Sequence, residues 1–161
     1  MNTEEFDKVN ALDRDGLHQE AFDLLTSLGE KNDPIALFEL SARYFSSDGQ
    51  WPEILKIDRD LEKSKILAER GRIELEKLAN DNDGEAMRML GYLFIGHLCP
   101  YPKNTDKAEN LLLQSVSAGC HFAANDLATY YQGSDIEKAK YWYKYAEDKG
   151  CRVVHNPTLE T

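Results

Sequence analysis

The sequence of 161 residues contains no apolar run that approaches the roughly 18 residues of a membrane-spanning helix, so we expect no membrane insertion. Residues 1–6 are polar and acidic, and they lack the basic start and apolar middle of a secretory signal. Cysteine is scarce, and the odd number formed by Cys99, Cys120 and Cys151 favours reduced thiols. Together these absences predict a cytoplasmic protein.

Basic residues are also in short supply. The chain has 19 Lys and Arg against 29 Asp and Glu, which gives a net charge of -10 at pH 7. Nucleic acids and anionic membranes need clustered Lys and Arg, so we expect neither as a partner. Two interpretations of the acidity remain open: attraction to a basic protein partner, and simple solubility.

Motifs typical of catalytic, phosphate-binding or metal-binding sites are missing as well. We find neither a nucleophile paired with a base nor a glycine-rich phosphate loop. The four histidines, His18, His97, His121 and His155, fall on different expected hairpins, and no Cys-x-x-Cys or His-x-x-x-His pair supports the neighbouring cysteines as zinc ligands. The sequence therefore predicts no catalytic, cofactor-binding or metal site.

What the chain does contain is an internal repeat near its C-terminus. Ala86, Leu90 and Gly96 each have a counterpart of the same type 37 positions later, and Lys107 and Gly119 each have one 31 positions later. The two copies therefore differ by six residues, all of them lost from the loop inside a helical hairpin. Self-similarity at such a period indicates a solenoid of stacked hairpins.

A third copy of the pattern lies upstream. Asp33 and Pro34 form a helix start signal, and Leu40 then repeats the position of Leu90. A long loop from about residue 46 to 57 follows, in which we expect Trp51 to fold back over a repeat edge. The partner helix starts at Asp58 or Asp60 and ends near Asn80. We prefer one long helix there, although Gly71 leaves a break into two helices open.

These patterns predict an all-α fold, a right-handed α-solenoid of about four antiparallel hairpins in a single domain, residues 1–161. Small residues are expected where helices cross, and leucine and tyrosine fill the space between repeats. A Lys-Ala pair starts the second helix of the two C-terminal copies, with alanine packed and lysine outward. The first hairpin is expected to end at Gly29. The hairpins span about 3–29, 33–80, 83–119 and 120–150, with a tail at 151–161.

The Ala-x-x-x-Leu-Gly, Lys-Ala and Trp-Tyr-x-x-Ala elements resemble those of the Sel-one-like repeat (SLR) family, shorter relatives of tetratricopeptide repeats. The chain departs from the family pattern where Ser41 and Ala128 replace a glycine and Ser64 replaces the alanine after Lys63. The resemblance implies a non-catalytic protein–protein interaction protein. Short family members that neutralise a cognate toxin make an immunity protein the favoured role. The alternatives are a regulatory adaptor or scaffold and, in a different class, an enzyme or metal-binding protein.

The first helix of each hairpin is expected to line a concave groove that binds the partner. With Leu40, Leu90 and Leu127 taken as equivalent, the positions two before, two after and five after each leucine point into that groove. The predicted partner-binding residues are Phe38, Phe45, Arg88, Tyr92, Ile95, Asn125, Thr129 and Gln132, with Ala42 at the remaining position. The alternative for Phe38 and Phe45 is ordinary core between repeats.

An acidic run precedes the best-preserved copies of the repeat. It consists of Glu74, Glu76, Asp81, Asp83 and Glu85. One interpretation is that these carboxylates steer a basic partner towards the groove. The other is that they form a solvated helix end and turn.

Overall fold

The computed structural model describes residues 3–45, 50–95, 103–153 and 159. The predictions that concern Gly96, His97, Cys99 and His155 lie outside these residues. Regular structure in the described part is helical throughout, which confirms the all-α class. None of its helices is both long and apolar enough to cross a bilayer. The chain divides into two compact units, Met1–Glu74 and Leu75–Thr161.

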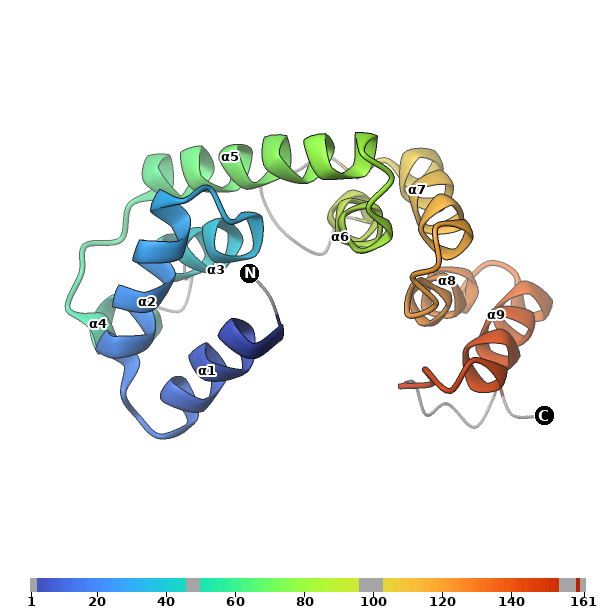
Figure 1. Cartoon of the computed structure of the whole chain (residues 1–161), viewed down its shortest axis with the longest axis horizontal. Coiled ribbons are helices and arrows are strands. Elements are labelled where there is room, and N and C mark those ends of the chain that lie inside the picture. Colours follow the sequence, from blue (N-terminus) through green and yellow to red (C-terminus); the bar gives the residue numbers. More distant parts are fainter. Residues whose placement is uncertain (1–2, 46–49, 96–102, 154–158, 160–161) are drawn as a thin grey trace. The chain divides into compact units, whose positions relative to one another are not determined.

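The first unit is built from short helices at the N-terminal end of the chain, each packed on a neighbour (Figure 1). α1 packs on α2, α2 packs on α3, and α4 contacts both α2 and α3. The helix α5 begins in this unit and ends in the second one. The bounds are α1 Thr3–Arg14, α2 His18–Glu30, α3 Pro34–Phe45, α4 Gln50–Leu55 and α5 Leu61–Asn80.

The second unit continues with two pairs of helices. α6 packs on α7, α8 packs on α9, and α8 also contacts both α6 and α7. The bounds are α6 Gly84–Ile95, α7 Thr105–Ser117, α8 Ala123–Tyr131 and α9 Ile136–Asp148. Apart from α2, which ends one residue beyond its range at Glu30, the helices of both units fall within the predicted hairpin ranges. The solenoid arrangement and the number of repeats stay predictions.

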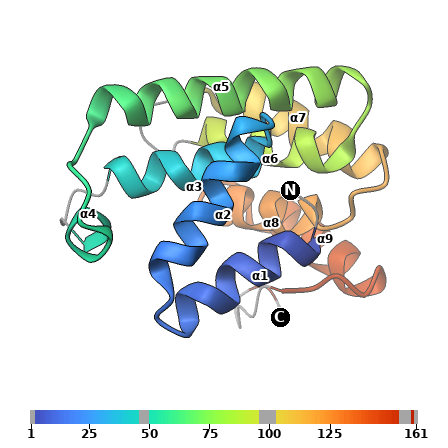
Figure 2. The ribbon, with the colours of Figure 1, turned by 60° about the vertical axis from the view of Figure 1, so that its left-hand side comes forward.

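The prediction of one long helix before residue 80 is confirmed by α5, which Figure 2 shows as an uninterrupted ribbon. Gly71 lies within this helix, at a point where α3 passes close by and leaves little room for a side chain. A Cβ atom at Gly71 would lie 3.0 Å from the ring of Phe38 and 3.2 Å from the carbonyl oxygen of Pro34. The glycine therefore serves close packing, at a cost to helix propensity of about 1 kcal/mol relative to alanine.

The helices α5, α7 and α9 begin in the same way. A side-chain oxygen accepts a hydrogen bond from the backbone N–H three residues later, which satisfies a free donor of the first turn. The pairs are Asp60 with Lys63 (2.9 Å), Asn104 with Lys107 (3.0 Å) and Asp135 with Lys138 (3.1 Å). The same three lysines place their Nζ atoms over the rings of Tyr44 (4.2 Å), Phe94 (4.2 Å) and Tyr131 (4.7 Å). Each ring belongs to the last turn of α3, α6 or α8.

Small buried residues mark the place where these helices cross, as the pattern predicts. The buried pairs at equivalent positions are Ser41 with Ser64, Gly91 with Ala108, and Ala128 with Ala139. The two serines stand where the other hairpins have glycine or alanine, and they are hydrogen-bonded to each other. The Ser64 hydroxyl donates to the Ser41 carbonyl oxygen at 2.9 Å, and the two hydroxyl oxygens lie 3.0 Å apart.

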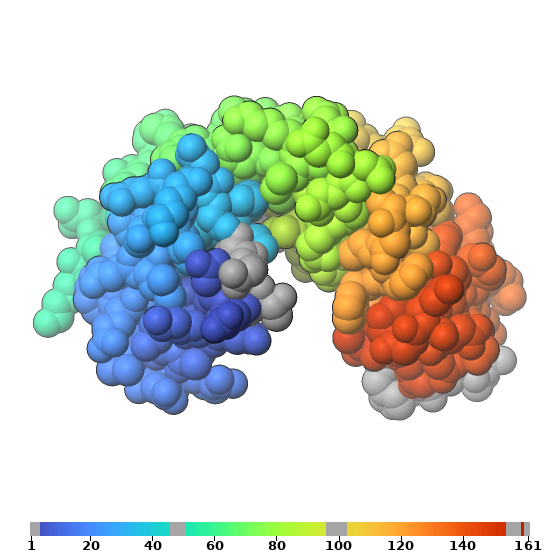
Figure 3. Space-filling model, in the orientation of Figure 1, coloured from blue at the N-terminus to red at the C-terminus, as the bar shows by residue number. Residues whose placement is uncertain are grey.

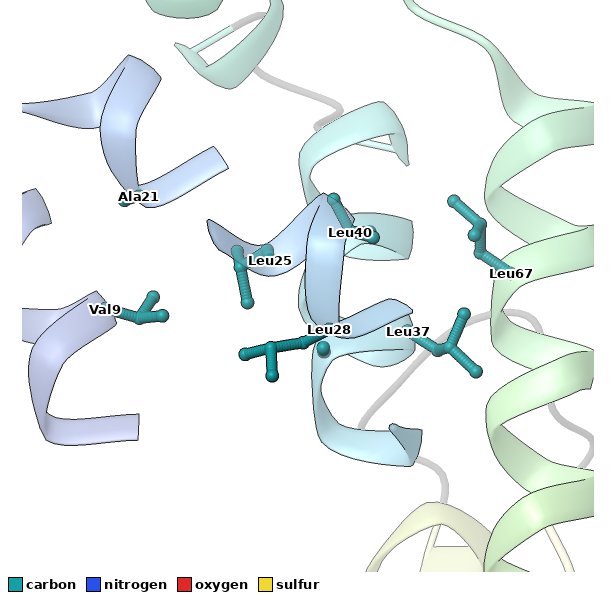
Figure 4. Close-up of a cluster of buried hydrophobic side chains, with 8 residues drawn as sticks. Val9, Ala21, Leu25, Leu28, Leu37, Leu40 and Leu67 are labelled. Atoms are coloured by element: carbon teal, nitrogen blue, oxygen red, sulfur yellow. The ribbon is translucent and has the colours of Figure 1, made fainter. Parts of the chain in front are cut away.

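The core of the first unit draws on four helices, and Figure 4 shows its side chains pointing toward one another. α1 contributes Val9, and α5 contributes Leu67. Burial of such aliphatic side chains is the main favourable term for a short helix that is unstable alone. The cluster is Val9, Ala21, Leu25, Leu28, Ala36, Leu37, Leu40 and Leu67.

One core cluster of the second unit lies among α7, α8 and α9, and it includes one residue from the tail. The cluster is Leu112, Ala123, Leu127, Ala128, Tyr131, Ala139, Tyr143 and Leu159. Leu159 is buried, and Cys151 is buried beside Ala124 and Ala146. These described residues of the tail therefore pack against the last hairpin.

Two predictions about the first unit are wrong. The segment 46–57 is not entirely a loop, because Gln50–Leu55 forms α4 with Pro52 in its first turn, where proline is tolerated. Gly29 does not end α2, which continues to Glu30. Asn32, with a φ of 59°, provides the left-handed residue after the helix, while Gly29 lets Leu40 approach closely.

Gly91→Ala is expected to destabilise the second unit by about 1–3 kcal/mol in a urea titration, although alanine favours helices. The new Cβ atom would lie 2.8 Å from Leu112 Cγ and 3.2 Å from the Ala108 carbonyl oxygen. Gly133→Ala is the matched control, because no heavy atom lies within 4 Å of the Cβ position there. Equal stabilities for the two variants would contradict the close crossing of α6 and α7.

Candidate protein-interaction surface

The second unit carries a cavity of about 510 Å³ between α6 and α8. We call it the α6–α8 cavity. It is lined by Tyr92 and Ile95 from α6, by Asp126, Thr129 and Tyr130 from α8, and by Lys103 and Gly133 from the flanking segments. Three of these residues, Tyr92, Ile95 and Thr129, belong to the predicted partner-binding set.

Helical spacing explains why these side chains meet. Asp126, Thr129 and Tyr130 follow the spacing i, i+3 and i+4, which places them along one face of α8, and Gly133 follows in the turn after the helix. Tyr92 and Ile95 have the spacing i and i+3 on α6. The prediction for α8 included Thr129 but missed Asp126, Tyr130 and Gly133. The i, i+3, i+4 stripe itself is the signal in the sequence that identifies them.

Two tyrosines form aromatic walls of the cavity. Tyr92 is 44% exposed. The ring of Tyr130 packs edge-on against the ring of Tyr131, with the two centroids 5.0 Å apart. Tyr131 is itself fixed by a hydrogen bond from its hydroxyl to the Glu109 carboxylate. Burial raises the pKa of Tyr130, and its hydroxyl donates to the Thr105 carbonyl oxygen at 3.5 Å.

Arg88 lies next to the cavity and is held in place by two carboxylates. Its Nε donates to Asp126 Oδ2 at 2.6 Å, and its Nη1 donates to Glu85 Oε1 at 2.8 Å. Burial opposes the charge, but the ion pair and hydrogen bond with Asp126, together with Glu85, raise the pKa of Arg88 above its usual value. The guanidinium is therefore permanently charged and pre-positioned. Its Nη2 makes no hydrogen bond within the described residues.

Asp126 is the acidic group of the cavity lining, and only 14% of its side chain is exposed. Burial raises the pKa of this carboxyl, and the Arg88 charge opposes that rise. Lys103 is the basic group of the lining. It is exposed, and it makes no hydrogen bond or ion pair within the described residues. The lining thus carries one charge of each sign, and the negative one is already neutralised by Arg88.

The prediction that Asn125 faces a partner is wrong, because its side chain is only 3% exposed. Its amide nitrogen donates to the Cys151 carbonyl oxygen at 2.6 Å, and its amide oxygen accepts from the Val153 backbone N–H at 3.1 Å. Asn125 therefore fastens the tail to α8. Gln132 is exposed after the end of α8, but it does not line the cavity.

The predicted residues of the first unit lie on α3. Phe38 is half-buried, with its ring against Gly71 of α5, which agrees with the alternative of ordinary helix–helix packing. Phe45 is also half-buried at the end of α3, and Ala42 is exposed. The structure thus gathers Tyr92, Ile95 and Thr129 at one cavity, while Phe38 and Phe45 belong to the other unit.

The acidic run before α6 is largely engaged in structure. Glu76 pairs with Lys107 at 3.6 Å, Asp83 caps α6 by accepting from the Ala86 backbone N–H at 2.9 Å, and Glu85 binds Arg88. Most of the net negative charge of the chain lies outside this run. Residues 3–30, the α1–α2 hairpin whose outer surface is blue in Figure 3, contain eight Asp and Glu against two Lys and Arg. That hairpin alone accounts for a charge of −6.

Histidine and cysteine side chains in the described part have structural partners. His18 Nδ1 lies 3.1 Å from Asp13 Oδ1, and His121 Nδ1 lies 3.1 Å from the Tyr145 hydroxyl. The Cys120 thiol donates to Glu85 Oε2 at 3.0 Å, and burial raises its pKa. Within the described ranges, no group of three or more His, Cys, Asp and Glu side chains is arranged to hold a metal ion.

Comparison with known proteins yields no match to a protein-family model, to a curated protein or to a solved structure. The resemblance to Sel-one-like repeats therefore rests on the motifs of this chain and stays a prediction.

Proposed function

We propose that this chain is a non-catalytic protein-binding protein and that the α6–α8 cavity is its principal contact surface. The observation that supports this proposal is the cavity itself, which an exposed tyrosine lines and beside which a fixed arginine pairs with Asp126. Tyrosine and arginine are the residue types that most often dominate the binding energy of protein interfaces. Arg88 is held by Asp126 and Glu85 before any partner arrives, so little side-chain entropy is lost on binding.

The favoured role is that of an acidic immunity protein that binds and neutralises a cognate toxin or effector. The concentration of negative charge on the α1–α2 hairpin supports a basic partner, because such a field accelerates association with a positively charged protein. The partner would be inactivated when its functional face is covered. The alternative role is a regulatory adaptor that captures a peptide or helix, which the modest size of the cavity also suits.

Co-expression tests the immunity role. The product of a neighbouring gene is expressed alone and together with this chain, and the wild-type chain is expected to restore growth. Tyr92→Ala is expected to weaken that protection, because it removes one wall of the cavity. Tyr141→Ala is the matched control, since Tyr141 is an exposed tyrosine of α9 outside the cavity lining. A neighbouring product that is harmless on its own would count against the immunity role.

The salt dependence of association tests the steering by charge. With an identified basic partner, the association rate is expected to fall by about tenfold or more as salt rises from low to physiological concentration. Glu20→Gln with Asp23→Gln removes two exposed carboxylates of α2 and should lower the rate at low salt. Glu137→Gln on α9 is the control. An association rate that is independent of salt would show that the acidic hairpin serves solubility alone.

A further inference from the structure

We propose that the α6–α8 cavity receives an uncharged aromatic side chain from the partner. This inference rests on the proposed function and adds to it the chemistry of the group that the cavity recognises. Three features of the cavity carry it: the balance of charge, the nature of the walls and the open space at Gly133.

The charges of the cavity favour a neutral occupant. Asp126 is already paired with Arg88 at 2.6 Å, and Arg88 is also paired with Glu85. An inserted cation would be repelled by Arg88 and Lys103. Among the residues that line the cavity, an inserted carboxylate could pair only with Lys103, which is exposed, and an ion pair with an exposed lysine contributes little. Either charge would also lose hydration on entering the cavity, and such a pair offsets little of that cost.

The walls favour an aromatic ring over a small aliphatic group. Tyr92 and Tyr130 present aromatic surface from two different helices, and Ile95 adds apolar area between them. Aromatic pairs gain energy beyond simple burial when their rings meet edge-on or offset. Tyr130 is fixed by Tyr131 and Glu109, so this wall is rigid before binding. A volume of about 510 Å³ leaves room for a large ring.

Gly133 is a position where a larger residue could fill the cavity without disturbing the fold. It lines the cavity, and a Cβ atom placed on it would meet no heavy atom within 4 Å. Gly133→Leu should therefore fill space that the partner's ring would occupy. Ser134→Leu adds the same side chain to the next residue, which is exposed and does not line the cavity. It is the matched control.

Nuclear magnetic resonance titration of the full chain tests the inference without a known partner. The probes are N-acetyl-tryptophan amide, N-acetyl-arginine amide and N-acetyl-glutamate amide, which differ in charge and ring. We expect the tryptophan probe to bind with a dissociation constant on the order of 1 mM. Its saturable shifts should centre on the backbone amides of Tyr92, Thr129 and Gly133. Gly133→Leu should weaken binding by about tenfold, and Ser134→Leu should leave it unchanged.

Three results would overturn the inference: no saturable shift with the tryptophan probe, tighter binding of either charged probe, or equal binding by Gly133→Leu and the wild-type chain. Retained signal dispersion in the variant spectrum shows that Gly133→Leu is folded. The probes report on the cavity alone, whereas co-expression reports on the whole function. Tryptophan binding without protection in cells would leave the inference standing and reject the immunity role. Protection without tryptophan binding would support the immunity role and reject the inference.

Discussion

Asp13→Ala is expected to destabilise the first unit by about 3–5 kcal/mol, because it leaves a buried arginine without its counter-ion. Arg43 on α3 is only 2% exposed, and its Nη2 lies 2.6 Å from Asp13 Oδ2. The ring of Trp51 covers the guanidinium at 4.1 Å and excludes water from it. Arg43 Nε has no hydrogen-bond partner within the described residues, so Asp13 supplies most of the compensation.

A double-mutant cycle in urea separates the charge pair from simple packing. Arg43→Met with Asp13→Ala removes both charges, and this double variant is expected to be more stable than Asp13→Ala alone. Glu39 lies near Arg43, and burial raises its pKa, so it can offset only part of the loss. Glu62→Ala is the control, because its pair with Lys65 is exposed and contributes within about 0.5 kcal/mol. A loss below about 1 kcal/mol for Asp13→Ala would contradict the burial of this pair.

Leu127→Ala is expected to destabilise the second unit by about 2–5 kcal/mol, since it removes a fully buried side chain from a packed core. Leu127 has 0% exposure and packs in one cluster with residues of α7 and α9. The position is also the reference from which the repeat register was predicted. The measurement is a denaturant titration followed by far-ultraviolet circular dichroism.

Ile136→Ala is the comparison for this experiment. Ile136 is an aliphatic residue of the same unit that is largely exposed at the start of α9, so its truncation should change stability by less than about 1 kcal/mol. If Leu127→Ala cost less than about 0.5 kcal/mol, the register of the repeats, and with it the assignment of the cavity face, would be wrong.

Local signals predicted the helices well because each is encoded by residues close in sequence. Asp33 and Pro34 place the start of α3, and Asp60 places the start of α5. The periodic leucines identify the buried faces, and the small residues near Leu90 identify the helix crossings. α4 was missed because a segment of six residues is too short to show helical periodicity.

The errors at the candidate site have a different cause, which is contact between residues far apart in the chain. Asn125 was predicted to face solvent, but 26 residues separate it from Cys151, the tail residue that covers it. The pair of Arg43 with Asp13 spans 30 residues, and Arg88 with Asp126 spans 38. On α8 the cavity is lined by the half-buried Asp126 and Tyr130 beside the predicted Thr129.

The most direct test of the central claim is quantitative affinity capture at low and moderate salt with three baits. The baits are the wild-type chain, Gly133→Leu and Ser134→Leu, and each captured protein is quantified by mass spectrometry. We predict one protein held at close to one-to-one by the wild type and by Ser134→Leu, and strongly reduced on Gly133→Leu. If every captured protein were retained equally by all three baits, the α6–α8 cavity would not be the binding surface.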